Sequence, residues 1–436
     1  MPQFLSTNDV DFESRFQALL SAKREDSPDV DAVVGGIIAD VQARGDAAVL
    51  ELTAKFDRLD LTADQMRFSA EEIAAECAKV DPADREALQI AADRIGAYHA
   101  RQMPEDAEWV DAIGATLGWR WTPVSAAGLY VPGGLATYPS SVLMNAIPAK
   151  VAGVDRLAIC VPTPDGAINP MVLLAAQIAG VDEIYRIGGA QAIAAMAYGT
   201  ETIAPVDKIT GPGNAFVAAA KRRVFGKVGI DMIAGPSEIL VIADKDNDPD
   251  WIAVDLLSQA EHDESAQSIL ITDDATFGQS VAVAVETRLR TLERRAIAEA
   301  SWKEFGAVIV VRSLDEAAAL SDRIAPEHLE LCVADAENYV QKINHAGAIF
   351  VGAWTPEAIG DYIGGPNHVL PTARSARFSS GLSVMDFVKR TTLSKMTPAA
   401  LAAIGPAAER LATSESLQAH GLSVAARLAK LNRADG

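Results

Sequence analysis

The chain has 436 residues, 49% of them hydrophobic, which predicts a large buried core divided between two or more domains. Its 38 basic and 59 acidic residues give a net charge of −21, so the average field repels a phosphate backbone and argues against nucleic-acid binding. No basic side chain precedes Arg15, no apolar run approaches the ~18 residues of a membrane span, and three widely spaced cysteines offer no disulfide framework, so we expect a cytoplasmic protein that does not contact membranes.

Apolar residues recur at helical spacing through the first hundred residues, for example between Val30 and Val41. We therefore expect a helical opening, with an N-terminal arm at residues 1–25. The helices that follow, up to residue 129, are assigned to the same domain as residues 235–380.

From about residue 126, short apolar strands alternate with alanine-rich helices, which is typical of serial βαβ units and a parallel sheet. The expected strands form two runs, at 128–131, 156–161, 183–187, 208–210 and 230–233, and at 239–242, 268–272, 307–311, 329–333 and 348–351. We predict an α/β fold with two Rossmann-like domains, each built on an incomplete, doubly wound parallel sheet. Residues 130–234 form a nucleotide-binding-like domain, and residues 26–129 and 235–380 form a metal- and substrate-binding domain.

Residues 381–436 are predicted to form a small helical tail. Thr397 and Pro398 are a helix start signal, and no strand of convincing length is expected after Phe387. The tail is rich in alanine and has too little core to be stable alone.

Two segments carry candidate metal ligands. Gln259 and His262 are three residues apart on an expected helix that begins at Pro249, so they share one face, although such a pair is more often part of a surface or a core. Asp361 and His368 lie in a glycine-rich segment after a strand, and the carboxyl ends of parallel strands are where α/β sheets bind ligands. Asp361 can supply a hard oxygen ligand there, or it can simply hold a turn.

A third segment carries an adjacent acid and imidazole, Glu327 and His328, just before an expected strand. At such a junction the two side chains can line one cleft as two bases, or they can be solvated strand-end residues. Four of the six histidines lie in these three segments or in the tail, which favours a metal or acid–base centre. They are His262, His328, His368 and His420.

The G-x-G-x-x-G fingerprint of dinucleotide-binding folds is missing from the sequence. Residues 188–191 and 211–214 nevertheless each end an expected strand and open a helix, where free N–H groups suit a phosphate. Residues 130–134 form a third loop at the same edge of the sheet, and Tyr130 can pack on a ring there. Each loop alone is more often a simple turn.

Taken together, these motifs resemble the histidinol dehydrogenase family over nearly the whole chain. They occur in the family's order at residues 130–134, 189–191, 211–216, 234–238, 259–262, 325–331 and 367–372.

The resemblance implies the last step of histidine biosynthesis, in which L-histidinol is oxidised through L-histidinal to L-histidine with two NAD. It implies one zinc ion per subunit that orients the substrate, held by Gln259, His262, Asp361 and His420. The implied substrate contacts are these four ligands together with Ser237, His328 and Glu415. The implied NAD contacts are Tyr130, Gln191 and Asn214.

The resemblance also implies separate roles for the paired bases: His328 takes the hydroxyl proton in the first oxidation, and Glu327 activates water for the second. The family builds each active site across a homodimer, in which the tail of one subunit delivers Glu415 and His420 to the other.

Other functions are also compatible with parts of the sequence. A related dehydrogenase acting on another amino alcohol would keep most of the motifs, and a metal-dependent hydrolase would use Glu327 without a nucleotide. A binding protein without activity would be expected to lose a ligand or a base, and none is lost. A thioester mechanism would need a thiolate, whereas Cys332 lies inside an expected strand and is expected to be a core residue.

Overall fold

The computed structural model describes residues 2–22, 28–133, 138–233 and 235–434. The chain divides into two compact units: unit 1 comprises Met1–Gln102 and Ser125–Phe387, and unit 2 comprises Met103–Val124 and Val388–Gly436. Within the described ranges, no helix combines the length and the apolar character that crossing a membrane requires.

The first sheet of unit 1 has five parallel strands. They are β4 (Ala126–Tyr130), β5 (Arg156–Cys160), β6 (Glu183–Tyr185), β7 (Lys208–Thr210) and β8 (Gly229–Ile230). Their order is β6-β5-β4-β7-β8, so the chain reverses its direction of travel between β4 and β7. In doubly wound sheets this reversal opens a crevice at the carboxyl ends of the two central strands.

The second sheet of unit 1 has six parallel strands in the order β1-β11-β10-β9-β12-β13. They are β1 (Gln3–Ser6), β9 (Glu238–Ala243), β10 (Gln267–Thr272), β11 (Ala307–Val310), β12 (His328–Cys332) and β13 (Ala348–Val351). Without β1, both sheets have the same order relative to the chain, with the first strand of each run in the middle. The predicted fold class, two incomplete doubly wound sheets, is confirmed.

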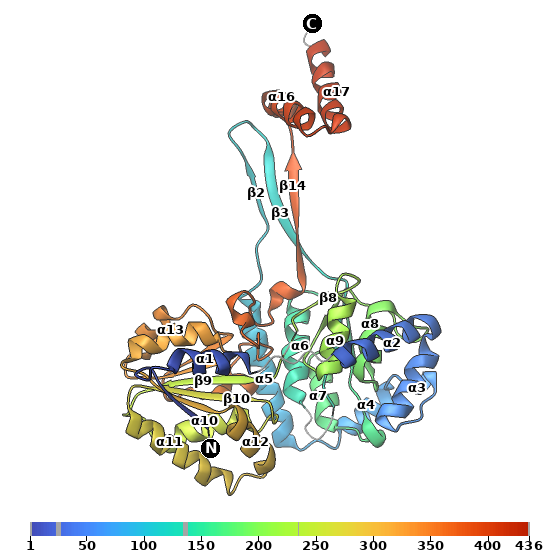
Figure 1. Ribbon diagram of the computed structural model, residues 1–436. Coiled ribbons are helices and arrows are strands. Elements are labelled where there is room, and N and C mark those ends of the chain that lie inside the picture. Colours follow the sequence, from blue (N-terminus) through green and yellow to red (C-terminus); the bar gives the residue numbers. More distant parts are fainter. Residues whose placement is uncertain (1, 23–27, 134–137, 234, 435–436) are drawn as a thin grey trace. The chain divides into compact units, whose positions relative to one another are not determined.

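Helices cover both faces of the six-stranded sheet (Figure 1). One face carries α10 (Pro249–Ala260), α11 (Ala275–Leu289) and α12 (Arg295–Phe305), and the other carries α1 (Phe12–Ser21), α13 (Leu314–Ile324) and α14 (Ala336–Tyr339). Leu329 and Leu331 of β12 pack on the α1 and α13 side, and Cys332 packs on the α10 side. Because side chains alternate along a strand, His328 and Glu330 share the α10 face with Cys332.

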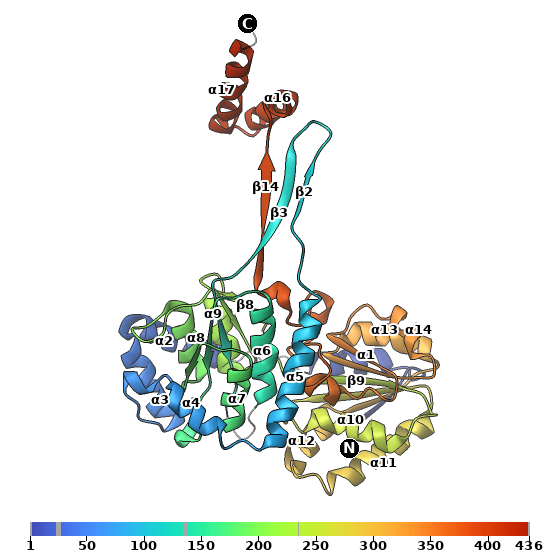
Figure 2. The ribbon, with the colours of Figure 1, turned by 180° about the vertical axis from the view of Figure 1, so that it is seen from behind.

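The five-stranded sheet is covered by α6 (Pro139–Val151), α7 (Pro170–Ile178), α8 (Gly189–Tyr198) and α9 (Ala215–Val224). Four more helices come from the N-terminal region: α2 (Pro28–Arg44), α3 (Asp46–Asp57), α4 (Ala70–Cys77) and α5 (Pro82–Ala100), of which α5 packs beside α6 (Figure 2). The apolar face of α2 packs against α8 and α9, whereas the sequence grouped this region with residues 235–380. An apolar stripe shows that a helix is packed, but it does not say on which sheet.

The N-terminal arm differs from the purely helical prediction, because β1 precedes α1 and extends the six-stranded sheet beside β11. Only Leu5 of this strand is buried, so the four residues leave no apolar periodicity to detect.

Unit 2 combines an antiparallel sheet with two helices. Its strands are β2 (Ala107–Val110), β3 (Thr116–Pro123) and β14 (Val388–Lys395), in the order β14-β3-β2, and its helices α16 (Pro398–Ser414) and α17 (Gln418–Ala434) pack on each other. Thr397 caps α16 as expected, by accepting the N–H of Ala400. The expectation of a purely helical tail was wrong, because β14 pairs with β3 along its whole length. Its side chains are mostly exposed and polar, so the sequence shows no apolar alternation that would predict the strand.

Candidate active site

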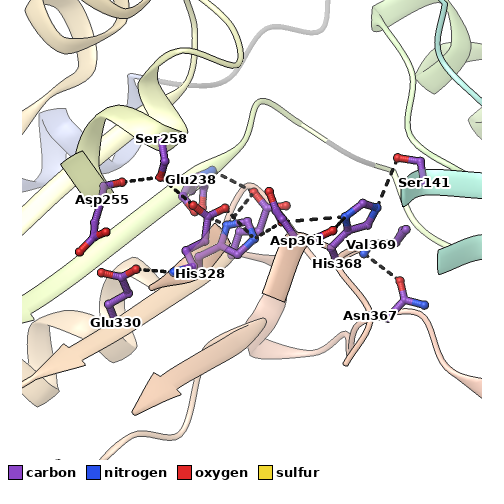
Figure 3. A network of polar contacts seen from close by, with 12 residues as sticks. Ser141, Glu238, Asp255, Ser258, His328, Glu330, Asp361, Asn367, His368 and Val369 are labelled. Atoms are coloured by element: carbon purple, nitrogen blue, oxygen red, sulfur yellow. Dashed lines mark hydrogen bonds and ion pairs between the residues drawn. The ribbon is translucent and has the colours of Figure 1, made fainter. Parts of the chain in front are cut away.

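The candidate site of unit 1 lies at the edge where β9 and β12 begin (Figure 3). Helix α15 (Glu357–Tyr362) runs antiparallel to β12, since its first residue bonds to Glu330 in mid-strand and Asp361 approaches His328 at the start of the strand. Asp361 therefore lies at the amino edge of the sheet, on a helix. The predicted position in a loop at the carboxyl edge was wrong, because α15 carries the chain back across the sheet.

Glu327 and His328 are both buried, and both contact the backbone of Glu238, the first residue of β9. The Glu327 Oε2 accepts the backbone N–H of Glu238 at 2.9 Å, and the His328 Nδ1 lies 2.9 Å from the Glu238 carbonyl oxygen. A carbonyl only accepts, so Nδ1 carries the hydrogen and Nε2 is left as the basic atom. Burial raises the pKa of Glu327 and lowers that of His328, which favours the uncharged form of each group.

Two carboxyl groups of α15 face the basic atom of His328. The Nε2 atom is 3.7 Å from the Glu357 Oε1 and 3.9 Å from the Asp361 Oδ1. Among the described residues, these three side chains offer donor atoms that all lie within 4.8 Å of one another, and the group could hold a metal ion. Burial raises the pKa of both carboxyl groups, and their mutual repulsion adds to the shift of Asp361.

Gln259 lies in the last turn of α10, and His262 lies in the turn just beyond the helix, where its N–H bonds to the Gln259 carbonyl. Gln259 is fully buried, yet neither atom of its amide has a hydrogen-bond partner in the described part of the chain. Such an orphaned buried amide is costly and suits a group that coordinates a ligand. Burial lowers the pKa of His262 to about 4, which keeps the imidazole in its neutral, metal-binding form.

His368, whose role the sequence left open, is an anchor in the structure. Its Nδ1 donates to the Asp361 carbonyl at 2.9 Å, and its Nε2 lies 3.3 Å from the hydroxyl of Ser141 on α6. Both ring nitrogens are used, so His368 connects α15 to α6, which packs on the other sheet. Ser237 directly precedes β9, and its carbonyl accepts the N–H of Gln267.

The three glycine-rich loops meet at the carboxyl ends of β4 and β7. The Tyr130 hydroxyl, at the end of β4, accepts the N–H of Gly189 at 3.0 Å, and Gln191 is buried in the first turn of α8. Asn214 caps α9 by accepting two backbone N–H groups. Gly134, part of the first motif, lies outside the described residues, as does Ala234 of another.

Gly211 lets two of these loops approach closely. Its φ is +114°, and a Cβ atom there would lie 2.1 Å from the Tyr130 carbonyl oxygen. Its N–H donates to Asp231 at 2.8 Å and its carbonyl accepts from Lys221 at 2.9 Å, and these two side chains form a buried ion pair.

Glu415 and His420 belong to unit 2. Glu415 ends α16, His420 lies in the first turn of α17, and both side chains are exposed. Cys332 is buried and burial raises its thiol pKa, as expected of a core residue.

Four polar side chains beside the site were not predicted from the sequence. Asp255 and Ser258 on α10 and Glu330 on β12 are labelled in Figure 3, and the fourth is Glu357 on α15. Two signals were available. Glu330 follows His328 by two residues and so shares its face of the strand, and Glu357 precedes Asp361 by four, one helical turn.

Known proteins match both units of the chain. A sequence profile described as histidinol dehydrogenase matches residues 20–428. Proteins named histidinol dehydrogenase from Ruegeria pomeroyi and Cereibacter sphaeroides are 78% and 76% identical over 432 residues, which is 99% of this chain and 100% of each relative. The crystal structure of histidinol dehydrogenase from Elizabethkingia anophelis is 39% identical, covers 99% of both chains and has a TM-score of 0.94.

Proposed function

The chain belongs to the histidinol dehydrogenase family of oxidoreductases, and from that premise we propose that it oxidises L-histidinol through L-histidinal to L-histidine, with two NAD and one zinc ion per subunit. The observation that carries the proposal is the pairing of Glu327 and His328. Both are buried and hydrogen-bonded to one backbone residue, and His328 lies 3.9 Å from Asp361, one of the proposed metal ligands.

Gln259, His262 and Asp361 are the zinc ligands that we propose from unit 1, and His420 is the fourth. The fit is supported by the unpaired amide of Gln259, the neutral imidazole of His262 and the carboxyl oxygens of Asp361. When bound, zinc holds the nitrogen atoms of the substrate in place and NAD accepts the hydride.

His328 and Glu327 are the bases. The Nε2 of His328 takes the proton of the substrate hydroxyl, because the other ring nitrogen is occupied by the Glu238 carbonyl. Glu327 takes a proton from the water that hydrates the aldehyde, and burial raises its pKa, which makes its ionised carboxylate a stronger base. Ser237 and Glu415 add substrate contacts in this proposal.

The crevice of the five-stranded sheet is the NAD site that we propose, with Tyr130, Gln191 and Asn214 as contacts. Beside it lies a cavity of about 530 Å³, lined by apolar side chains including Phe56, Phe68 and Pro162. A cavity of this size and character suits part of a nucleotide, since ligand sites usually measure about 300–1,000 Å³.

A homodimer with shared sites completes the proposal, with Glu415 and His420 reaching the partner subunit. Large apolar side chains are exposed on unit 1: Trp354 is 86% exposed and lies edge-on against Trp251, and Tyr362, which follows Asp361, is 59% exposed. A contiguous exposed apolar patch often marks a protein interface, which is compatible with a dimer.

A spectrophotometric assay tests the function. Histidinol and NAD should give NADH absorbance at close to two NADH per histidine formed, and removal of zinc by a chelator should abolish the signal until zinc is added back. A hydrolase would form no NADH, and a dehydrogenase for another amino alcohol would leave histidinol unused. Full activity in protein that metal analysis shows to be free of zinc would contradict the metal assignment.

Gly211→Ala tests the NAD site. The added methyl cannot fit beside the Tyr130 carbonyl, so the loop must move, and a displacement of ~1 Å can cost about 10²-fold in rate. We expect KM for NAD to rise at least about tenfold, with the zinc content unchanged. Gly36→Ala is the matched control, because nothing lies within 4 Å of its Cβ position on α2. Equal KM values in the two variants, both shown to be folded by thermal unfolding, would move the NAD site elsewhere.

A further inference from the structure

Behind the site, a second group of polar side chains joins three elements of unit 1. Glu330 accepts the backbone N–H of Glu357 at 2.6 Å, which fixes the first turn of α15 to the middle of β12. The carboxyl group of Asp255 on α10 lies close enough to that of Glu330 for its charge to raise the pKa of Glu330, so β12 and α10 are adjacent at this point. Neither Asp255 nor Glu330 has a place in the proposed chemistry.

Ser258 closes the connection between the two helices. Its hydroxyl oxygen lies 2.9 Å from the Glu357 Oε2 and 2.7 Å from the Asp255 carbonyl oxygen, so α10 and α15 are joined directly (Figure 3). We call Asp255, Ser258, Glu330 and Glu357 the α10–α15 link.

The two glutamates of the link are buried, whereas Asp255 and Ser258 are half-buried. Glu330 and Glu357 are each 1% exposed, and burial raises the pKa of Glu330 and Asp255. Two neighbouring carboxyl groups repel each other when both are ionised, which adds to the effect of burial on the pKa of Glu330.

The link ends next to two proposed metal ligands. Gln259 directly follows Ser258 in α10, and Asp361 lies one helical turn after Glu357 in α15. A bond between Ser258 and Glu357 therefore restrains the two helical backbones that carry Gln259 and Asp361.

We propose that Ser258 and Glu330, which both bond to Glu357, are positioning residues that hold Gln259 and Asp361 where one metal ion can bind both. This inference rests on the zinc site of the proposed function. Partners behind metal ligands usually contribute about 10–100-fold to metal affinity, because they orient the ligands before the ion binds.

Ser258→Ala gives the cleanest test, because it removes one hydroxyl and leaves the carboxyl pair in place. In the full-length protein, competition with a chromophoric chelator should show zinc bound about 10–100-fold more weakly than in the wild type. The absorption bands of bound Co²⁺ should also shift, because the ligands are held less well. Ser268→Ala is the matched control: this buried hydroxyl also donates to α10, at the Leu256 carbonyl 2.7 Å away, but it touches no carboxyl group. We expect the control to bind zinc as the wild type does.

Glu330 provides a rescue test. In Glu330→Gln the side-chain oxygen can still accept the Glu357 N–H that Glu330 accepts at 2.6 Å, so zinc affinity should stay close to that of the wild type. Glu330→Ala loses this bond, and its affinity should fall as in Ser258→Ala. Thermal unfolding of the metal-free proteins distinguishes a loss of fold from a loss of positioning. If Glu330→Ala fails to fold, the comparison of Ser258→Ala with Glu330→Gln still tests the inference.

The measurements distinguish a failure of the positioning role from a failure of the zinc assignment. If the wild type binds zinc and Ser258→Ala binds it equally tightly with the same Co²⁺ spectrum, the link is structural only and the inference is overturned. If the wild type itself binds no zinc, the metal assignment of the proposed function fails, and the inference fails with it.

Discussion

Replacing Glu327 by Gln is expected to slow the oxidation of histidinal to histidine by about 10²–10⁴-fold, the usual contribution of a general base, and to slow the oxidation of histidinol much less. The Gln oxygen can still accept the Glu238 N–H that Glu327 accepts at 2.9 Å, so the local fold should persist. What is lost is the ability to take a proton from water. Single-turnover rates measured with histidinol and with histidinal separate the two oxidations.

The pH dependence gives an independent check on Glu327. The base works in its ionised form, and burial raises its pKa, so the wild-type aldehyde step should slow as the pH falls through a value above the usual range of a glutamate. This acid limb should be absent in Glu327→Gln. Zinc content and thermal unfolding serve as controls. Equal losses in both oxidations, in a folded and zinc-loaded variant, would count against the separate roles of Glu327 and His328.

The parallel sheets could be predicted from the sequence because their strands are buried on both faces. Strands β9 and β10 are buried along their whole length and therefore stand out as continuous apolar runs. Strand β14 has the opposite character, since its side chains are mostly exposed and its pairing partner, β3, comes more than 260 residues earlier in the chain. Such a strand is set by tertiary pairing, which a local pattern does not report.

The candidate site was predictable residue by residue, but its surroundings were not. Glu327 and His328 are adjacent in the sequence, and the resemblance pointed to them directly. The edge of the sheet on which they meet Asp361 depends on the direction of α15, and a general preference for carboxyl edges gave the wrong answer. Glu357 was missed because an acidic residue at the start of a helix usually stabilises the helix alone.

The sequence also does not say how the residues of the two units combine into one site. Gln259, His262 and Asp361 lie in unit 1, whereas His420 lies in unit 2, so the proposed zinc site draws on both. Whether unit 2 serves its own subunit or the partner is therefore a question of assembly, which a heterodimer can answer.

Mixing two inactive variants, His262→Asn and His420→Asn, is expected to restore activity. Each homodimer lacks one proposed ligand at both of its sites. In a heterodimer, the His420→Asn chain still carries Gln259, His262 and Asp361, and the tail of the other chain supplies the missing His420. One site is then whole and the other lacks two ligands.

Co-refolding the two chains should therefore give about a quarter of the wild-type activity, since random pairing makes about half of the dimers mixed and each mixed dimer has one whole site of two. Zinc content should follow the same proportion, which provides a readout apart from turnover. Mass analysis of the mixed dimers shows that both chains fold and exchange, and each variant refolded alone is the control. A tail that serves its own subunit would carry each defect into its own site, so verified heterodimers that remain inactive would mean that Glu415 and His420 do not act across the dimer.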